Sequence, residues 1–161
     1  MQDLAVLPRY KADDMLVATP NKSGSMSAPQ MVPAPVVLVV DDEPTVLRLM
    51  ERALASAGYE VHAASNGLRA LEIALGLPAP PAILVSDINM EPIDGPDLAR
   101  LMIHSLPRIK VLFVSGFPTD PAHAPVTGPV LKKPFDLDVL VNTVAGLVGV
   151  TKDANPGAAR V

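Results

Sequence analysis

Residues 35–44 read PVVLVVDDEP, an apolar run that ends abruptly in acidic residues. The run at 35–40 predicts a strand that is buried on both faces, as strands of parallel sheets are. Asp41 and Asp42 follow it directly, and Pro44 stands where the first turn of a helix tolerates proline. The stretch therefore predicts a buried strand that leads through acidic residues into a helix.

The same alternation of strand and helix signals continues along the chain. After Pro44, apolar residues recur at helical spacing until Gly58. Further strands are predicted at 59–63, 82–85, 110–114 and 130–131, and further helices at about 67–75, 96–106 and 137–148. Such alternation indicates βαβ units, whose right-handed crossovers place helices on both faces of a sheet. The predicted fold class is α/β, with a doubly wound five-stranded parallel sheet.

The connection between the last two predicted strands is rich in proline. Pro118, Pro121, Pro125 and Pro129 leave little uninterrupted chain. A helical turn takes about 3.6 residues, and a proline inside a helix costs about 3 kcal/mol. The helix due at this point, the fourth, is therefore predicted to be short or missing.

Composition divides the chain into a central domain and two flanking segments. Residues 1–35 contain five prolines and a polar run at 21–25, which predicts a flexible leader. Residues 151–161 are short and polar, and are predicted to be a flexible tail. Residues 36–150 remain as one domain of ordinary size.

The overall composition excludes several classes of protein. Apolar residues make up 49% of the 161 residues and charged residues 19%, which suits a compact core, and the absence of cysteine excludes disulfides and thiolate metal sites. No export signal is visible, and the longest apolar stretch, 139–150, is shorter than the roughly 20 residues that span a bilayer. We expect a cytoplasmic protein without membrane contact.

Charge within the central domain is predominantly acidic. Residues 36–150 carry 13 acidic and 8 basic side chains, a net charge of −5. They contain no stripe of basic residues, which is the usual electrostatic signature of nucleic-acid binding. Nucleic acid is therefore not an expected partner.

Polar residues stand at the carboxyl ends of the predicted strands, where open parallel sheets bind ligands. They are Asp41, Asp42, Asp87, Ser115 and Lys133. If the first and third strands are neighbours, their carboxylates, at about 4 Å, repel by about 4 kcal/mol at an effective dielectric of about 20. Mg²⁺, which keeps several waters, suits two or three protein oxygens and removes this repulsion. An aspartate nucleophile beside Mg²⁺ and a lysine indicates acyl phosphate chemistry, with a hydroxyl available to the same group.

Five stretches of the sequence together resemble the receiver domain of bacterial two-component response regulators. They are VVLVVDDEPTVLRLM (36–50), GYEVHAASNGLRAL (58–71), ILVSDINMEPIDG (83–95), VLFVSGF (111–117) and VLKKPF (130–135). The resemblance implies a flavodoxin-like sheet with strand order 2-1-3-4-5. The SGF and PVLKKPF segments are similar to those of single-domain receivers with a reduced fourth helix.

The resemblance assigns the acidic residues to a phosphoacceptor and a magnesium site. Asp87 matches the phosphoacceptor. Asp42 matches the carboxylate that binds Mg²⁺, Asp41 matches the one that acts through water, and the backbone carbonyl of Asn89 completes the ligands, with Asp87 itself among them.

The remaining matched positions concern the phosphoryl group and its readout. Ser115 matches the hydroxyl residue and Lys133 the lysine that contact the phosphoryl oxygens, and the bond from Lys133 to Pro134 is usually cis in the family. Two positions depart from the pattern: Glu91 replaces a usual proline, and Val130 replaces the aromatic switch residue.

The resemblance also implies a function and partners. A sensor histidine kinase or a phosphotransfer protein would phosphorylate Asp87, and an unidentified downstream protein would read the result by contact. The domain would assist its own phosphorylation and dephosphorylation without being an enzyme, and would take no small-molecule substrate beyond phosphodonors.

Two alternatives stay open. One is a Mg²⁺-dependent phosphatase with an aspartate nucleophile, although residues 41–43 lack the Asp-x-Asp spacing; the other is a phosphorylation-independent interaction domain, which the valine at position 130 favours.

Overall fold

The structure is a computed structural model, and it describes residues 16–17, 30–31, 33–117 and 128–149. The elements of the central domain are β3 (Val36–Val40), α1 (Pro44–Ser56), β4 (Glu60–Ala64), α2 (Gly67–Gly76), β5 (Ile83–Asp87), α3 (Gly95–Ser105), β6 (Lys110–Ser115), β7 (Val130–Lys132) and α4 (Leu137–Val148). Two short strands precede them, β1 (Leu16–Val17) and β2 (Gln30–Met31), which pair with each other in antiparallel fashion. These two strands fall within the predicted leader; the rest of 1–32 and all of 150–161 lie outside the described residues.

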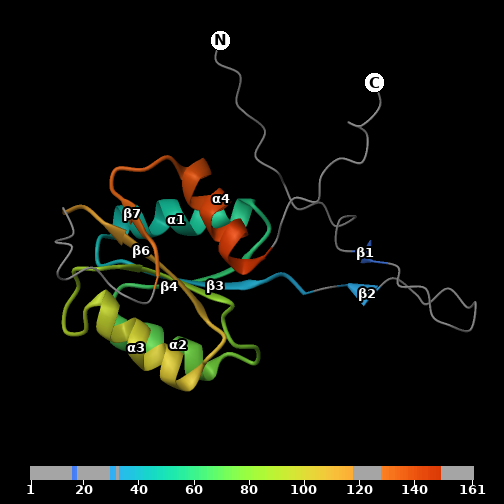
Figure 1. The fold of residues 1–161 in the computed structure, drawn as a ribbon, viewed down its shortest axis with the longest axis horizontal. Helices are drawn as coiled ribbons and strands as arrows, with labels where there is room; N and C mark the ends of the chain where they lie inside the picture. Colours follow the sequence, from blue (N-terminus) through green and yellow to red (C-terminus); the bar gives the residue numbers. More distant parts are fainter. Residues whose placement is uncertain (1–15, 18–29, 32, 118–127, 150–161) are drawn as a thin grey trace, which may run out of the picture.

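The main sheet has five parallel strands in the order β4-β3-β5-β6-β7. Counted along the domain, this is the order 2-1-3-4-5, so the predicted fold class and strand order are confirmed. Helices α1 and α4 cover one face of the sheet and α2 and α3 cover the other (Figure 1). The strand order reverses between β3 and β5, so the carboxyl ends of these two neighbours define the crevice where such sheets bind ligands.

Each face of the sheet has its own apolar core because successive side chains of a strand point to opposite faces. In β3, Val37 and Val39 pack under α1 and α4, whereas Leu38 and Val40 pack under α2 and α3. All five residues of β3 are buried, as are all five of β5. Burial on both faces explains why β3 and the first three residues of β5 are continuous apolar runs rather than alternating patterns.

The helices begin at residues whose side chains or rings suit a first turn. Pro44 is the first residue of α1. Asn66 and Asp94 cap α2 and α3, accepting hydrogen bonds from the backbone N–H groups three residues on, at 2.9 and 2.8 Å. Asp136 occupies the same position at α4 but makes no side-chain cap bond; its backbone carbonyl accepts from Val139 and Leu140 instead.

Two strands extend further than their apolar runs predicted. β5 runs through Asp87 and β6 through Ser115, because Asp87 stays in register with Val114 and Ser115 with Lys132. The polar residues are thus the last residues of their strands, where the backbone ladder fixes them. The predicted reduction of the fourth helix falls on 118–127, outside the described residues.

None of the helices within the described ranges is long and apolar enough to cross a membrane.

Candidate functional site

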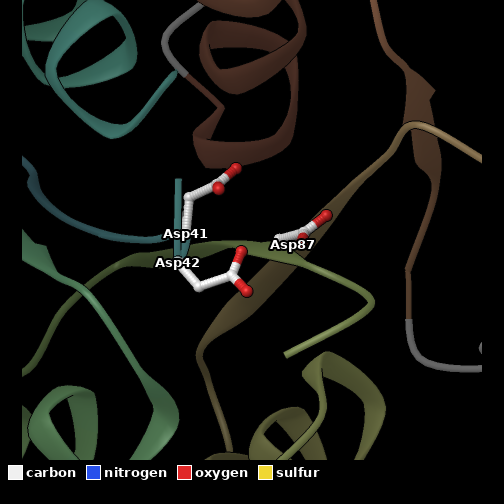
Figure 2. Close-up of side chains that lie close together, drawn as sticks. All are labelled: Asp41, Asp42 and Asp87. Carbon is white, nitrogen blue, oxygen red and sulfur yellow. The ribbon is translucent and has the colours of Figure 1, made fainter. Parts of the chain in front are cut away.

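Three carboxylates meet at the carboxyl edge of the sheet. Asp41 and Asp42 follow β3 and Asp87 ends β5, and each offers an oxygen that lies within 4.8 Å of the others (Figure 2). They meet because β3 and β5 are hydrogen-bonded neighbours that run in the same direction, up to the pair Val40 and Ser86. The predicted convergence of the acids from these two strands is confirmed.

The three acids differ in their access to solvent. Asp41 is fully buried and Asp87 is 6% exposed, whereas Asp42 is exposed. Asp41 is further fixed by its own turn, since its Oδ1 accepts a hydrogen bond of 2.9 Å from the backbone N–H of Glu43. The cluster therefore has two buried inner carboxylates and one outer carboxylate that faces water.

Lys133 brings a cation to the two inner carboxylates. Its Nζ donates to Asp41 Oδ2 at 2.7 Å and to Asp87 Oδ1 at 3.4 Å, and its side chain is 17% exposed. The backbone N–H of Lys133 donates to the Ser115 carbonyl at 2.7 Å, which holds the lysine to the end of β6. The bond to Pro134 is cis, as the resemblance implied, and Lys132 points out as an exposed residue.

The ionisation of Asp87 and Lys133 is shaped by their shared burial. Burial raises the pKa of the Asp87 carboxyl; the Lys133 charge opposes this, and the Asp41 and Asp42 carboxylates add to it, with a net rise. Burial lowers the pKa of Lys133, but its hydrogen bonds and attraction to Asp41 and Asp87 outweigh burial, so its pKa is raised. The lysine is therefore a cation at neutral pH.

Ser115 lies beside the cluster without bonding to it. Its side chain is buried, and its hydroxyl donates to the Phe117 carbonyl at 3.2 Å and accepts from the Phe117 N–H at 3.3 Å. The hydroxyl makes no hydrogen bond to Asp87 or Lys133, although the backbone carbonyl of Ser115 accepts from the N–H of Lys133. A contact with a phosphoryl group remains a prediction.

Asn89 lies in the bend after β5, two residues beyond the inner carboxylate of Asp87, and is exposed. The same bend contains a close approach that sequence reasoning missed. A Cβ added to Gly95 would lie closer than 3.0 Å to the Asp87 carbonyl oxygen, and the Gly95 N–H donates to the Ile88 carbonyl at 2.9 Å. The start of α3 therefore packs directly on the backbone of Asp87. The sequence signal for this contact is the glycine itself, because a residue without a Cβ permits close backbone approach.

The donor set fits a hard divalent cation. Three carboxylates with oxygens this close, one of them open to water, match the preference of Mg²⁺ for a few protein oxygens and retained waters. The single positive charge of the Lys133 ammonium is shared between the two inner carboxylates, Asp41 and Asp87.

Comparison with known proteins gives a consistent family. A family model described as response regulator receiver domain matches residues 37–145. Sensor kinase CckA of Brucella abortus is 41% identical over 148 residues, covering 86% of this chain but only 15% of CckA. Response regulator receiver protein CpdR of Brucella abortus is 35% identical over 112 residues, covering 67% of this chain and 92% of CpdR.

Solved structures agree with these relatives. The chemotaxis protein CheY4 of Vibrio cholerae has a TM-score of 0.65 at 26% identity, covering 71% of this chain and 98% of CheY4. A response regulator receiver protein from Sinorhizobium medicae has a TM-score of 0.65 at 29% identity, covering 72% of this chain and 95% of its own.

Proposed function

Because the chain belongs to the response regulator receiver domain family, we propose that Asp87 accepts a phosphoryl group from the phosphohistidine of a sensor histidine kinase or phosphotransfer protein. The observation that carries the proposal is the position of Lys133, whose ammonium contacts both Asp41 and Asp87 inside a cluster of three acids. A domain with no use for phosphoryl chemistry gains little from burying two like charges and a lysine at its edge.

The transfer is a single displacement at phosphorus. A carboxylate oxygen of Asp87 attacks, forming the P–O bond of an acyl phosphate, while the P–N bond to the donor imidazole breaks. The imidazole nitrogen keeps the bonding electron pair and takes up a proton from solvent. The 6% exposure of Asp87 limits the approach of water, and Asp42 marks the open side from which the donor arrives.

The remaining residues of the site stabilise charge during this step. Asp41, Asp42, Asp87 and the backbone carbonyl of Asn89 would hold Mg²⁺, which neutralises charge on the phosphoryl oxygens when bound. Lys133 holds the attacking carboxylate in place and then pairs with a phosphoryl oxygen, since an ammonium grips such a group as a point charge.

The signal is read when the added charge rearranges the site. The Ser115 hydroxyl would leave the Phe117 backbone for a phosphoryl oxygen, which changes the conformation of the segment after β6. We propose that a downstream protein reads this change by contact, and that the chain acts in the cytoplasm, where phosphohistidine donors are formed. CpdR, which this chain covers almost fully, is itself described as a response regulator receiver protein.

The test is acceptance of a labelled phosphoryl group at Asp87. The protein is incubated with a ³²P-phosphorylated histidine kinase and Mg²⁺, and the label is checked for the hydroxylamine lability of an acyl phosphate. We expect wild type and Asp94→Asn to be labelled and Asp87→Asn to stay unlabelled; Asp94 is a matched control because asparagine also caps α3.

Other outcomes separate the alternatives. Equal labelling of wild type and Asp87→Asn refutes the proposal. No labelling of wild type, with the fold intact, favours an interaction domain, and steady turnover of small phosphate esters favours a phosphatase.

A further inference from the structure

A buried serine stands next to the phosphoacceptor, on the other face of the sheet. Ser86 is fully buried and pairs in register with Val40 on β3 and Phe113 on β6. Those two neighbours belong to the apolar core under α2 and α3, whereas Asp87 and Lys133 meet on the opposite side. A hydroxyl in such surroundings is unfavourable unless it makes a hydrogen bond.

The hydrogen bond of Ser86 goes to the backbone of the phosphoacceptor itself. Its Oγ donates to the carbonyl oxygen of Asp87 at 2.9 Å. The register of β5 with β3 ends at Ser86, so Asp87 lies one residue past that pairing. The hydroxyl therefore binds the carbonyl at the point where the register with β3 stops.

The peptide unit after Asp87 is consequently held at both ends. Its carbonyl oxygen accepts from Ser86, and its N–H, that of Ile88, donates to the Val114 carbonyl at 3.0 Å. A peptide unit is planar, so hydrogen bonds at both its carbonyl and its N–H group restrict its rotation. Gly95 also packs against the same carbonyl oxygen, so closely that no Cβ would fit between them.

From this arrangement we propose that Ser86 is a positioning residue for phosphoryl transfer, acting from the back of the sheet through the carbonyl of Asp87. The inference rests on the function proposed above. The Cα of Asp87 is a corner of the fixed peptide plane, so the plane sets the direction of the side chain toward Lys133. The same plane begins the bend that carries Asn89, whose carbonyl is the predicted metal ligand.

The test compares Ser86→Ala, Ser86→Thr and Ile83→Val in the full chain. Ile83 is buried at the far end of β5, so Ile83→Val removes core packing without touching the Asp87 backbone. The readouts are the rate of acyl phosphate formation from acetyl phosphate at saturating Mg²⁺, the thermal midpoint, and the Asp87 carbonyl ¹³C shift by NMR.

We expect Ser86→Ala to fold but to react at least about tenfold more slowly, since a 1 Å misplacement of a reacting group can cost about a hundredfold. Its Asp87 carbonyl shift should move as the hydrogen bond is lost. Ser86→Thr should regain most of the rate because it keeps the hydroxyl, and Ile83→Val should react like wild type despite a lower midpoint.

Several results would overturn the inference. A wild-type rate or an unchanged carbonyl shift in Ser86→Ala would do so, as would an equally slow Ile83→Val or a folded Ser86→Thr as slow as the alanine variant. If wild type forms no acyl phosphate at all, the proposed function fails and the inference fails with it. If wild type forms the acyl phosphate but Ser86→Ala forms it at the same rate, the inference alone fails.

Discussion

Replacing Lys133 by methionine removes the cation between the two inner carboxylates while keeping much of the side-chain volume. At 2.7 and 3.4 Å, and at an effective dielectric of about 20, the two ion pairs are worth about 6 and about 5 kcal/mol of attraction before desolvation is subtracted. Removing one partner of a buried pair typically costs about 3–5 kcal/mol because the other charge stays behind. Since the lysine is 17% exposed and Asp42 opens the site to water, we expect about 3 kcal/mol, the low end of that range.

The sign of the effect depends on pH. The folded pKa of Lys133 is raised above 10.5, so its contribution to stability is fully present below 10.5 and is lost as pH rises through the folded value. At pH 7 the Lys133→Met variant should therefore lose the whole contribution of Lys133 to the free energy of unfolding. In acid, protonation of Asp87 removes part of the charge that the lysine compensates, so the difference between wild type and variant should shrink.

The measurement is urea unfolding followed by far-UV circular dichroism, in EDTA and in Mg²⁺. With an m-value of about 2 kcal/mol/M, a loss of about 3 kcal/mol lowers the midpoint by about 1.5 M. Lys132→Met is the matched control, because Lys132 is the exposed neighbour and should change stability by less than about 0.5 kcal/mol. Mg²⁺ should recover more stability in Lys133→Met than in wild type. If the two methionine variants unfold at the same urea concentration, the contacts of Lys133 do not hold the site together in solution.

Three further predictions concern the acids and the glycines. Because the pKa of Asp87 is raised above 3.8, its contribution to stability is fully present below pH 3.8 and is lost as pH rises through the folded value. Metal-free Asp87→Asn should therefore be more stable than wild type at pH 7, and this difference in stability should shrink as pH falls toward 3.8. Urea midpoints measured across this pH range test the prediction. Mg²⁺ at 100 times its dissociation constant should stabilise wild type by about 2.7 kcal/mol, and Asp42→Asn should need more Mg²⁺ for the same rise in thermal midpoint; equal titrations would contradict a role for Asp42. Gly95→Ala should lower the free energy of unfolding by at least about 2 kcal/mol, because the added methyl group meets the Asp87 backbone. Gly146→Ala is the control: it has open space in α4 and should raise the free energy of unfolding by about 0.5–1 kcal/mol. A Gly95→Ala variant as stable as wild type would contradict the close packing of α3.

Much of the fold follows from local sequence because the strands are buried on both faces. The runs at 35–40 and 82–85 contain no polar residue, so they are easily recognised as strands that are buried on both faces. The strand ends were placed too early, since Ser86 and Asp87 are polar but remain in the ladder with Phe113 and Val114. Hydrophobicity marks where a strand is buried, whereas backbone pairing decides where it stops.

The candidate site likewise has a part that the sequence predicts and a part that it does not. Residue type and position at the end of a strand were sufficient to predict that Asp41, Asp87 and Lys133 lie together. The hydrogen bond from Ser86 to the Asp87 carbonyl was not predictable, because it depends on the local path of the backbone rather than on any side-chain pattern. For the close approach of α3 to the same carbonyl, Gly95 itself was the only signal in the sequence.

The uneven exposure of the three acids has a consequence for how such a site is filled. An ion reached through the water-facing carboxylate of Asp42 can enter and leave while Asp41 and Asp87 stay in place. We therefore expect occupancy to follow the free concentration of divalent cation without a preceding opening of the protein. If the proposed magnesium site is used in this way, we expect the supply of divalent cation to be a second input that sets how readily Asp87 is phosphorylated.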